Sequence, residues 1–268
     1  MSAYPTVPGI VVEPDGGVLR VRLDRADRHN ALTDEMVLAL AETVDAAGND
    51  DTIRVIALTA TGPDFCSGFD LGTRGRPEVK PRTGATQRQL RVGVHRLIPT
   101  MLETQTPIVT TATGHIIGLG LGIVLASDFA FVADDARLRA PFTAMGFTPD
   151  SGTSWLLPRL VGVARAKELL VLGREISGAR AAEWGLVHRS TPAATVAGEA
   201  DALVAELASS ATVAVGLAKL LVHSGLTVDL DHHLADEALA IELSSRSDDF
   251  KESGRARRDR RPPDFHGF

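Results

Sequence analysis

Apolar residues that alternate with polar ones near the N-terminus predict a β-hairpin. Residues 11–12 and 18–24 are rich in valine and leucine, and the turn sequence E-P-D-G-G separates them. Two short apolar runs around a glycine turn are typical of paired antiparallel strands. Beyond the hairpin, apolar residues recur every three or four positions, at Met36, Val37, Leu40 and Val44. That spacing predicts a helix, and Thr33 is its expected N-cap.

Along the chain, the pattern changes from alternating strands and helices to helices alone. The front half has apolar runs that predict strands at 53–60, 107–113, 129–132 and 136–140, and helical spacing at 87–102. After Ser151 the predicted helices are 153–160, 164–172, 179–184, 195–209, 212–223 and 231–245, with a basic helix that two prolines end. We therefore predict an α/β core followed by a helical region.

The segment between residues 74 and 86 shifts in composition to glycine, proline, arginine and lysine. Such a composition disfavours both helix and strand, so the segment is predicted to be a flexible loop. The shape of a binding tunnel beside it would depend on a conformation that the sequence does not give.

Two glycine-containing stretches stand out as candidate functional turns. They are F-C-S-G-F-D-L at 65–71 and G-H-I-I-G-L-G-L-G at 114–122, and each follows a β-rich apolar run. Glycine permits sharp turns and lets a ligand approach the main chain closely. Two N–H groups that converge from such turns would form an oxyanion hole, which stabilises negative charge on an ester or thioester oxygen. The alternative is tight strand–helix packing with no ligand.

Composition and charge narrow the classes of function. The 268-residue chain has 44% hydrophobic and 23% charged residues, which is ordinary for a globular protein. Its net charge of −6 argues against non-specific nucleic-acid binding, which depends on neutralising phosphates. Because Cys66 is the one cysteine, no internal disulfide can form. The N-terminus lacks a signal-peptide pattern and the apolar runs are too short for a membrane span, so we expect a cytoplasmic protein.

Three further motifs accompany the glycine stretches: L-D-R-A-D-R-H-N-A-L-T-D-E-M at 23–36, D-S-G-T-S-W-L-L-P-R-L-V-G at 150–162 and W-G-L-V at 184–187. In this order they resemble the enoyl-CoA hydratase/isomerase (crotonase) superfamily over nearly the whole chain. The resemblance implies an α/β fold in which residues 1–200 form a spiral of ββα units that binds acyl-CoA. It also implies that residues 201–268 form a helical region that assembles trimers or hexamers.

The resemblance further implies where a thioester would be held. By motif position, the main-chain amides of Phe69 and Leu119 form the oxyanion hole, and Gly118 and Phe142 line the substrate site. Leu119 departs from the glycine usual in the family. This departure is strained only if the φ angle of Leu119 is positive.

Hydratases of the family use two glutamates, and the matching positions in this chain are Gly122 and Phe142. Neither residue can transfer a proton, and general acid–base catalysis contributes about 10²–10⁴ in rate. Hydration by the usual two-glutamate route is therefore not expected.

Asp150 matches the position of the single acid of the family's isomerases, and the string at 148–162 is similar to the phenylacetate-pathway epoxyacyl-CoA isomerases. One carboxylate suffices for a 1,3-proton shift, and burial favours the protonated form of a carboxylate. The apolar residues expected to bury it are Phe142, Met145, Phe147 and Trp155. The alternative role for Asp150 is a helix N-cap, since an apolar helix follows it.

His95 points to a second chemistry, because it lies at the spacing where 4-chlorobenzoyl-CoA dehalogenases of the superfamily carry a histidine. In those enzymes an aspartate at the Asp150 position attacks the ring, and a histidine-activated water releases the product. They carry tryptophan at the Phe142 position, so one element of their site is missing here. The alternative for His95 is a polar residue of an amphipathic helix. A third possibility for the chain is an acyl-CoA binder without catalysis.

The resemblance also implies contacts with coenzyme A, which belongs to the substrate and is not a permanently bound cofactor. The residues placed near it by the motifs are Arg25, Arg28, Ser67, Asp70, Leu71 and Arg260. Arg260 lies in the terminal basic helix, which in the family approaches the nucleotide, sometimes that of a neighbouring subunit. The histidines show no metal-ligand spacing, so no metal is expected. The implied partners are an acyl-CoA and further copies of the chain.

Overall fold

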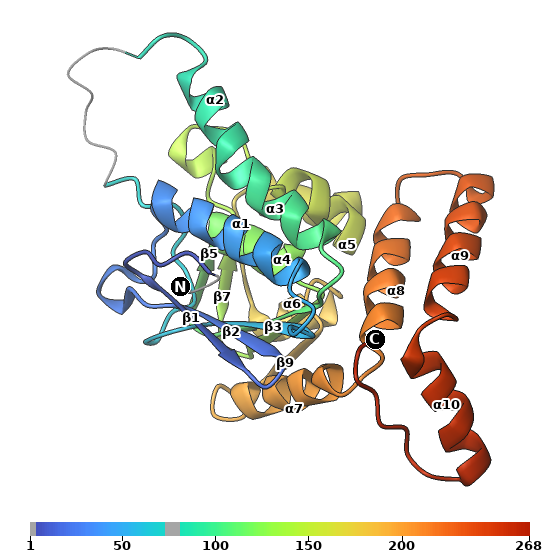
Figure 1. Ribbon diagram of the computed structural model, residues 1–268. Coiled ribbons are helices and arrows are strands. Elements are labelled where there is room, and N and C mark those ends of the chain that lie inside the picture. The colour runs from blue at the N-terminus through green and yellow to red at the C-terminus, as the bar shows by residue number, and fades with distance from the viewer. Residues whose placement is uncertain (1–3, 73–80) are drawn as a thin grey trace.

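Two β-sheets organise the structure, a computed structural model that describes residues 4–72 and 81–268 (Figure 1). The larger sheet has six strands in the order β1-β2-β3-β4-β6-β9. Its strands are β1 (Ile10–Asp15), β2 (Val18–Leu23), β3 (Val55–Ala60), β4 (Ile108–Ala112), β6 (Phe129–Ala133) and β9 (Arg189–Thr191). Only the β1–β2 pair in this sheet is antiparallel. The smaller sheet pairs β7 (Arg137–Arg139) with β5 (His115–Ile117) in parallel and with β8 (Glu175–Ser177) antiparallel.

The N-terminal hairpin and the first helix have the local chemistry that the sequence predicts. Asp15 pairs with Val18 across two glycines whose φ angles are 56° and 90°. A two-residue turn of this kind needs left-handed backbone, which glycine adopts without strain. Thr33 accepts a hydrogen bond from the amide of Met36 at 3.2 Å and caps α1 (Asp34–Gly48). The predicted hairpin and N-cap are confirmed.

The remaining helices, apart from α4, lie in stretches that the sequence predicts to be helical. They are α2 (Ala85–Val92), α3 (Val94–Glu103), α4 (Leu119–Ala126), α5 (Thr153–Leu170), α6 (Gly178–Glu183), α7 (Val196–Ala208), α8 (Thr212–Ser224), α9 (Leu230–Ser244) and α10 (Asp248–Asp259). Within the described residues, no single helix is long and apolar enough to cross a bilayer, although α7 and α8, at 112° to each other, reach that length as a pair.

Glycine interrupts two of the helical stretches. The single helix predicted at 87–102 is wrong, because it is broken between α2 and α3 at Gly93, whose angles of φ −105° and ψ −102° are non-helical. The two helices predicted at 153–160 and 164–172 are confirmed: within α5 they meet at a kink, where Gly162 has non-helical angles of φ 76° and ψ 165°. Of the loop predicted at 74–86, residues 74–80 lie outside the described residues, and Ala85 already begins α2.

The large sheet is covered on both faces. Ile56 and Leu58 of β3 belong to the main core with α1, α3 and α4, whereas Val55 and Ala57 pack on the other side against α7. Successive residues of a strand point to opposite faces, so β3 contributes to both layers. Figure 1 shows α1 and α3 on one side of the sheet and α7 on the other.

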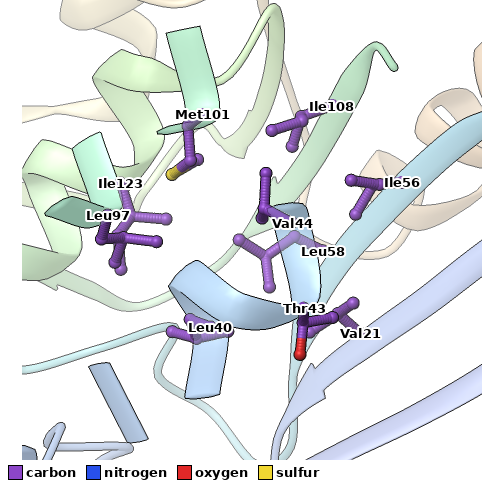
Figure 2. Close-up of a pocket in the computed structure, with 10 residues that line it drawn as sticks. All are labelled: Val21, Leu40, Thr43, Val44, Ile56, Leu58, Leu97, Met101, Ile108 and Ile123. Atoms are coloured by element: carbon purple, nitrogen blue, oxygen red, sulfur yellow. The ribbon is translucent and has the colours of Figure 1, made fainter. Parts of the chain in front are cut away.

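The centre of the main core is lined by side chains from six elements (Figure 2). Residues of β2, α1, β3, α3, β4 and α4 converge on a void of about 10 Å³, which is no more than the room one water needs. Thr43 contributes the one polar side chain of this lining. Its hydroxyl oxygen is buried and has no hydrogen-bond partner among the described residues.

A buried lysine attaches α8 to this core. The ammonium group of Lys219 donates to the carbonyl oxygens of Met101 (2.8 Å) and Thr106 (3.3 Å) and pairs with Asp128 at 2.8 Å. Burial lowers the pKa of Lys219, and the carboxylate of Asp128 opposes that shift. From this attachment, α8, α9 and α10 extend away from the sheets (Figure 1).

The boundary predicted between residues 200 and 201 falls inside α7. Val196, Ala200, Val204 and Leu207 of this helix all pack on the sheet. The part of the chain that projects from the core therefore begins after α7 ends at Ala208.

We predict that Thr43→Val raises the free energy of unfolding by about 1 kcal/mol, because it replaces a buried, unpaired hydroxyl with a methyl group of similar size. Thr33→Val is the matched control in the same helix, and it should lower stability by about 1 kcal/mol because it removes the N-cap hydrogen bond. Urea denaturation of the two variants measures both effects. A loss of stability in Thr43→Val would show that the hydroxyl has a partner.

Candidate active site

A cavity of about 600 Å³ opens where the two glycine-containing stretches meet. Its walls come from the turn at 67–71, from the junction of β5 and α4, from α2 and α3, and from residues 141–151. Segments that are far apart in the sequence therefore share one hollow. Apolar side chains with a few polar groups in such a cavity are typical of a small-molecule site.

Main-chain hydrogen bonds join the two stretches. The amide of Cys66 donates to the carbonyl of His115, and the amide of Ile117 donates to the carbonyl of Cys66, both at 2.9 Å. Gly68 has φ 99°, and a Cβ built on it would lie 3.0 Å from the carbonyl oxygen of Ile117 and 3.7 Å from the nitrogen of Leu119. Only glycine permits this approach, which brings residues 68–69 beside residues 117–119.

Phe69 and Leu119 both line the cavity. Leu119 is the first residue of α4, and the first amides of a helix have no acceptor within the helix. The described non-glycine residues with positive φ are His29, Asn30, Ser151 and Arg260. Leu119 is not one of them, so leucine at this position causes no backbone strain.

Cys66 is a packing residue and not a nucleophile. Its side chain is fully buried, and burial raises the pKa of the thiol to about 12. The sulfur accepts a hydrogen bond from the amide of Gly68 at 3.3 Å. A Cβ on Gly120 would lie 2.7 Å from the Cβ of Cys66, so α4 packs directly on this residue.

Asp150 is half-buried and lines the same cavity as Phe69 and Leu119. Its carboxylate accepts a hydrogen bond from the hydroxyl of Ser151. Its main-chain carbonyl, and not its side chain, accepts from the amide (3.1 Å) and hydroxyl (2.7 Å) of Thr153. The N-cap of α5 is Gly152, which has no side chain. The carboxylate of Asp150 is therefore not used as a helix cap.

Ser151 fills the space beside Gly122, a contact that sequence reasoning missed. Ser151 is buried and has φ 57°, a conformation that serine rarely adopts. A Cβ on Gly122 would lie 2.5 Å from the oxygen and 2.9 Å from the Cβ of Ser151. A glutamate at position 122 would therefore collide with Ser151. The sequence shows that position 122 is glycine, but it does not reveal that Ser151 fills the space beside it.

Three of the apolar residues expected around Asp150, Phe142, Met145 and Phe147, line the cavity with it. Phe142 is buried and packs edge-on against Phe147, with ring centroids 5.7 Å apart. Met145, Phe147 and Trp155 expose 50%, 42% and 37% of their surface, and that they bury the carboxylate of Asp150 stays a prediction. They lie on short turns or at the start of α5, where one side of each faces outward.

His95 lies on α3 and is exposed, and it lines two cavities. The second cavity, of about 770 Å³, lies between α3, the start of α5, and α8. Val94, His95, Pro149 and Asp150 line both, so they form the partition between them. His95 and Asp150 therefore line the same two cavities, and a shared catalytic role for them stays a prediction.

The residues expected to contact coenzyme A lie in different places. Arg25 donates to the carboxylate of Asp70 at 2.6 Å and to the carbonyl of Ala31 at 2.9 Å, and Asp70 also accepts from the amide of Gly72 at 2.9 Å. This ion pair braces the turn. Ser67, Gly68, Leu71 and Gly118 line the cavity. Arg28 is exposed, 3.8 Å from Asp27.

Arg260 does not lie near this cavity within one chain. It caps the C-terminal end of α10 in a left-handed conformation, φ 55°. Figure 1 shows α10 on the far side of the molecule from α1 and the β1–β2 edge. A contact between Arg260 and the nucleotide, of its own chain or of a neighbouring subunit, therefore stays a prediction. In the part of the chain that the structure describes, no three His, Cys, Asp or Glu side chains are arranged to hold a metal ion.

Residues 13–267 match the enoyl-CoA hydratase/isomerase family. The chain is 34% identical over 262 residues to the 1,2-epoxyphenylacetyl-CoA isomerase of Escherichia coli (strain K12), which covers 96% of this chain and 98% of that protein. It is 30% identical to 4-chlorobenzoyl coenzyme A dehalogenase-1 of Arthrobacter sp, over 83% of this chain and 80% of that protein.

Among solved structures, an enoyl-CoA hydratase from Bacillus anthracis superposes with a TM-score of 0.89 at 30% identity, covering 97% of this chain and 100% of that one. The predicted resemblance and α/β fold class, with a helical C-terminal region, are confirmed by these similarities.

Proposed function

This chain belongs to the enoyl-CoA hydratase/isomerase family of acyl-CoA enzymes, and from that premise we propose that it is an acyl-CoA isomerase that moves a double bond with Asp150 as its single acid–base. The observation that carries the proposal is the position of Asp150. Its carboxylate lines the cavity onto which Phe69 and Leu119 open, and helix capping does not use it.

In the proposed reaction, the thioester oxygen of the acyl-CoA accepts hydrogen bonds from the main-chain amides of Phe69 and Leu119. Asp150 removes a proton from carbon next to the carbonyl, so that a C–H bond breaks and an O–H bond forms. The negative charge passes to the thioester oxygen, where the two amides stabilise the dienolate. The same carboxyl group then returns its proton to the carbon two positions further along, and no other reactant is consumed.

The surroundings of Asp150 support isomerisation over hydration. Ser151 occupies the space beside Gly122, and Phe142 is buried where the second hydratase glutamate would stand. Neither of these two positions therefore supplies a carboxylate that could activate a water molecule. The 1,2-epoxyphenylacetyl-CoA isomerase of Escherichia coli is among the proteins to which the chain is similar. An acyl group derived from an aromatic ring is accordingly the first substrate class to test.

We expect Asp150→Asn to lower kcat for conversion of a 3-enoyl-CoA to the conjugated 2-enoyl-CoA by about 10³-fold, because the amide cannot accept the proton. Ultraviolet absorbance of the conjugated product measures the rate, and circular dichroism checks the fold. The matched control is Asp135→Asn, which makes the same charge change on the exposed turn between β6 and β7. Full activity in Asp150→Asn would rule out the mechanism.

Hydrolytic dehalogenation is the second candidate, because His95 and Asp150 line the same cavities. In that chemistry the carboxylate of Asp150 bonds to the halogen-bearing ring carbon and halide leaves. A water molecule that His95 deprotonates then cleaves the resulting ester. The buried Phe142 stands where the dehalogenases carry tryptophan, which is why isomerisation remains the proposal.

We expect no chloride release from 4-chlorobenzoyl-CoA, as measured with a chloride-selective electrode. Chloride release that disappears in both Asp150→Asn and His95→Gln would establish the second candidate. Tight binding of several acyl-CoA esters without any isomer, hydrate, acid or halide, as followed by mass spectrometry, would indicate a binding protein instead.

We also propose that α8, α9 and the turn between them form the contacts of a homotrimer, or of a hexamer made from two trimers. Their large apolar residues are exposed in the single chain: Val222, Leu226, Leu230, Leu234, Leu239 and Ile241. Burying such a surface is favourable by about 25 cal/mol per Å² of apolar area. Sedimentation velocity should give the mass of three or six chains of 28.4 kDa, and Leu239→Glu with Ile241→Glu should reduce it. A monomer at all concentrations would contradict the proposal.

A further inference from the structure

The carboxylate of Asp64 lies outside the cavity and connects two histidines. Its Oδ2 atom is 2.7 Å from Nδ1 of His29. Its Oδ1 atom accepts from the amide of His115 at 2.8 Å and lies 2.7 Å from Nδ1 of the same residue. Asp64 is buried, whereas both imidazole rings reach the surface. We call these three residues the Asp64 clasp.

The clasp joins three segments of the site. His29 lies in the turn before α1, Asp64 immediately precedes the turn that carries Phe69, and His115 begins the strand that leads to Leu119. Main-chain bonds follow the same connections, since the amide of Ser67 donates to the carbonyl of His29 at 3.0 Å. Both proposed oxyanion amides therefore lie within five residues of a member of the clasp.

The fit around the carboxylate is tight. A Cβ on Gly114 would lie 2.4 Å from Oδ1 of Asp64 and 2.3 Å from the carbonyl oxygen of Pro63, and Gly114 has φ 57°. The side chain of Asn30 donates to the carbonyl of Asp64 at 2.7 Å. Hydrogen bonds thus hold both the main chain and the carboxylate of Asp64, and together they fix its position relative to β5.

Electrostatics favour an ionised Asp64. Burial alone would raise the pKa of its carboxyl group, but hydrogen bonds from His29 and from the amide and ring of His115 outweigh burial and lower the pKa below its ordinary value. A carboxylate only accepts, so both Nδ1 atoms must donate, and this fixes the orientation of both rings. The other groups that face the clasp are Arg137, which lies 3.5 Å from Nε2 of His115, and Glu175, which pairs with Arg137 at 2.7 Å.

We propose that Asp64 is a positioning residue of the oxyanion hole: through His115 and His29 it holds the turn of Phe69 and the β5–α4 junction of Leu119 at a fixed separation. The inference rests on the proposed function, because it assigns a role to the amides that the proposal uses. Asp64 and His115 touch no substrate in this role. They act by fixing the distance between two main-chain donors. Catalysis is sensitive to this distance, because a small displacement of aligned groups lowers the rate by a large factor.

The test uses Asp64→Asn and His115→Ala in the full-length chain. Each should lower kcat by about tenfold or more while KM changes by less than about threefold, because the amides stabilise the enolate more than the bound ester. A second readout is 4-dimethylaminocinnamoyl-CoA, whose absorption moves to longer wavelength when its carbonyl oxygen accepts hydrogen bonds. Both variants should reduce the red shift of this bound probe. His115→Asn, whose amide can donate to Asp64, should restore part of it.

Asp50→Asn is the matched control, because this aspartate accepts from the hydroxyl of Tyr4 at 2.8 Å and from the amide of Thr52 at 3.0 Å, away from the cavity. It should change stability without changing the red shift. If Asp64→Asn does not fold, His115→Ala provides the test. This variant is expected to fold, because Asp64 keeps its hydrogen bonds to His29 and to the amide of residue 115. Wild-type kcat and wild-type red shift in folded Asp64→Asn or in His115→Ala would overturn the proposal.

Failure of the proposed function gives a different result. In that case Asp150→Asn stays active, or the wild-type protein binds the probe with a red shift but converts no enoyl-CoA. The red shift then still reports whether the Asp64 clasp positions the amides. A wild-type protein that binds the probe with no red shift overturns the inference, because there is then no oxyanion hole to position.

Discussion

The short main-chain ladder through Cys66 holds the two glycine-containing turns together, and the arrangement of the site depends on it. Its two hydrogen bonds, both 2.9 Å, attach the turn of residues 65–71 to β5. Small residues on both sides allow the approach, since Gly68 lies against Ile117 and Gly120 against Cys66. The groups proposed to bind the thioester are main-chain amides. Leucine can therefore stand at position 119, where the backbone keeps an ordinary φ.

Around this fixed geometry, the side chains of the cavity select the proposed reaction. The carboxylate of Asp150 does not cap α5, because the N-cap position is occupied by Gly152. It accepts a hydrogen bond from the hydroxyl of Ser151 instead. Phe142 closes one side of the cavity with an apolar ring. The hydrogen bonds that shape the turns are thus separate from the group proposed to move the proton. A common scaffold with different side chains is how one fold comes to host several reactions.

Local patterns in the sequence were sufficient to predict much of the fold. The glycine turn of the hairpin, the Thr33 cap and most helices follow from spacing and from residues that act on their immediate neighbours. Three of the three-residue strands, β5, β8 and β9, are too short to show a period, and the helical spacing of residues 87–102 continues across Gly93 without marking the break there. The motifs placed Asp150 and the two turns near each other. They did not reveal the Ser151–Gly122 contact or the Asp64 clasp, because partners distant in sequence leave no periodic signal.

Ser151 and Gly122 occupy one small volume between them, since a single carbon added to Gly122 would come within 2.5 Å of the Ser151 oxygen. That oxygen belongs to the main chain, so no exchange of the side chain at position 151 makes room for a larger residue at position 122. A longer side chain at position 122 requires the backbone of Ser151 itself to move, and this backbone is left-handed and leads directly into α5.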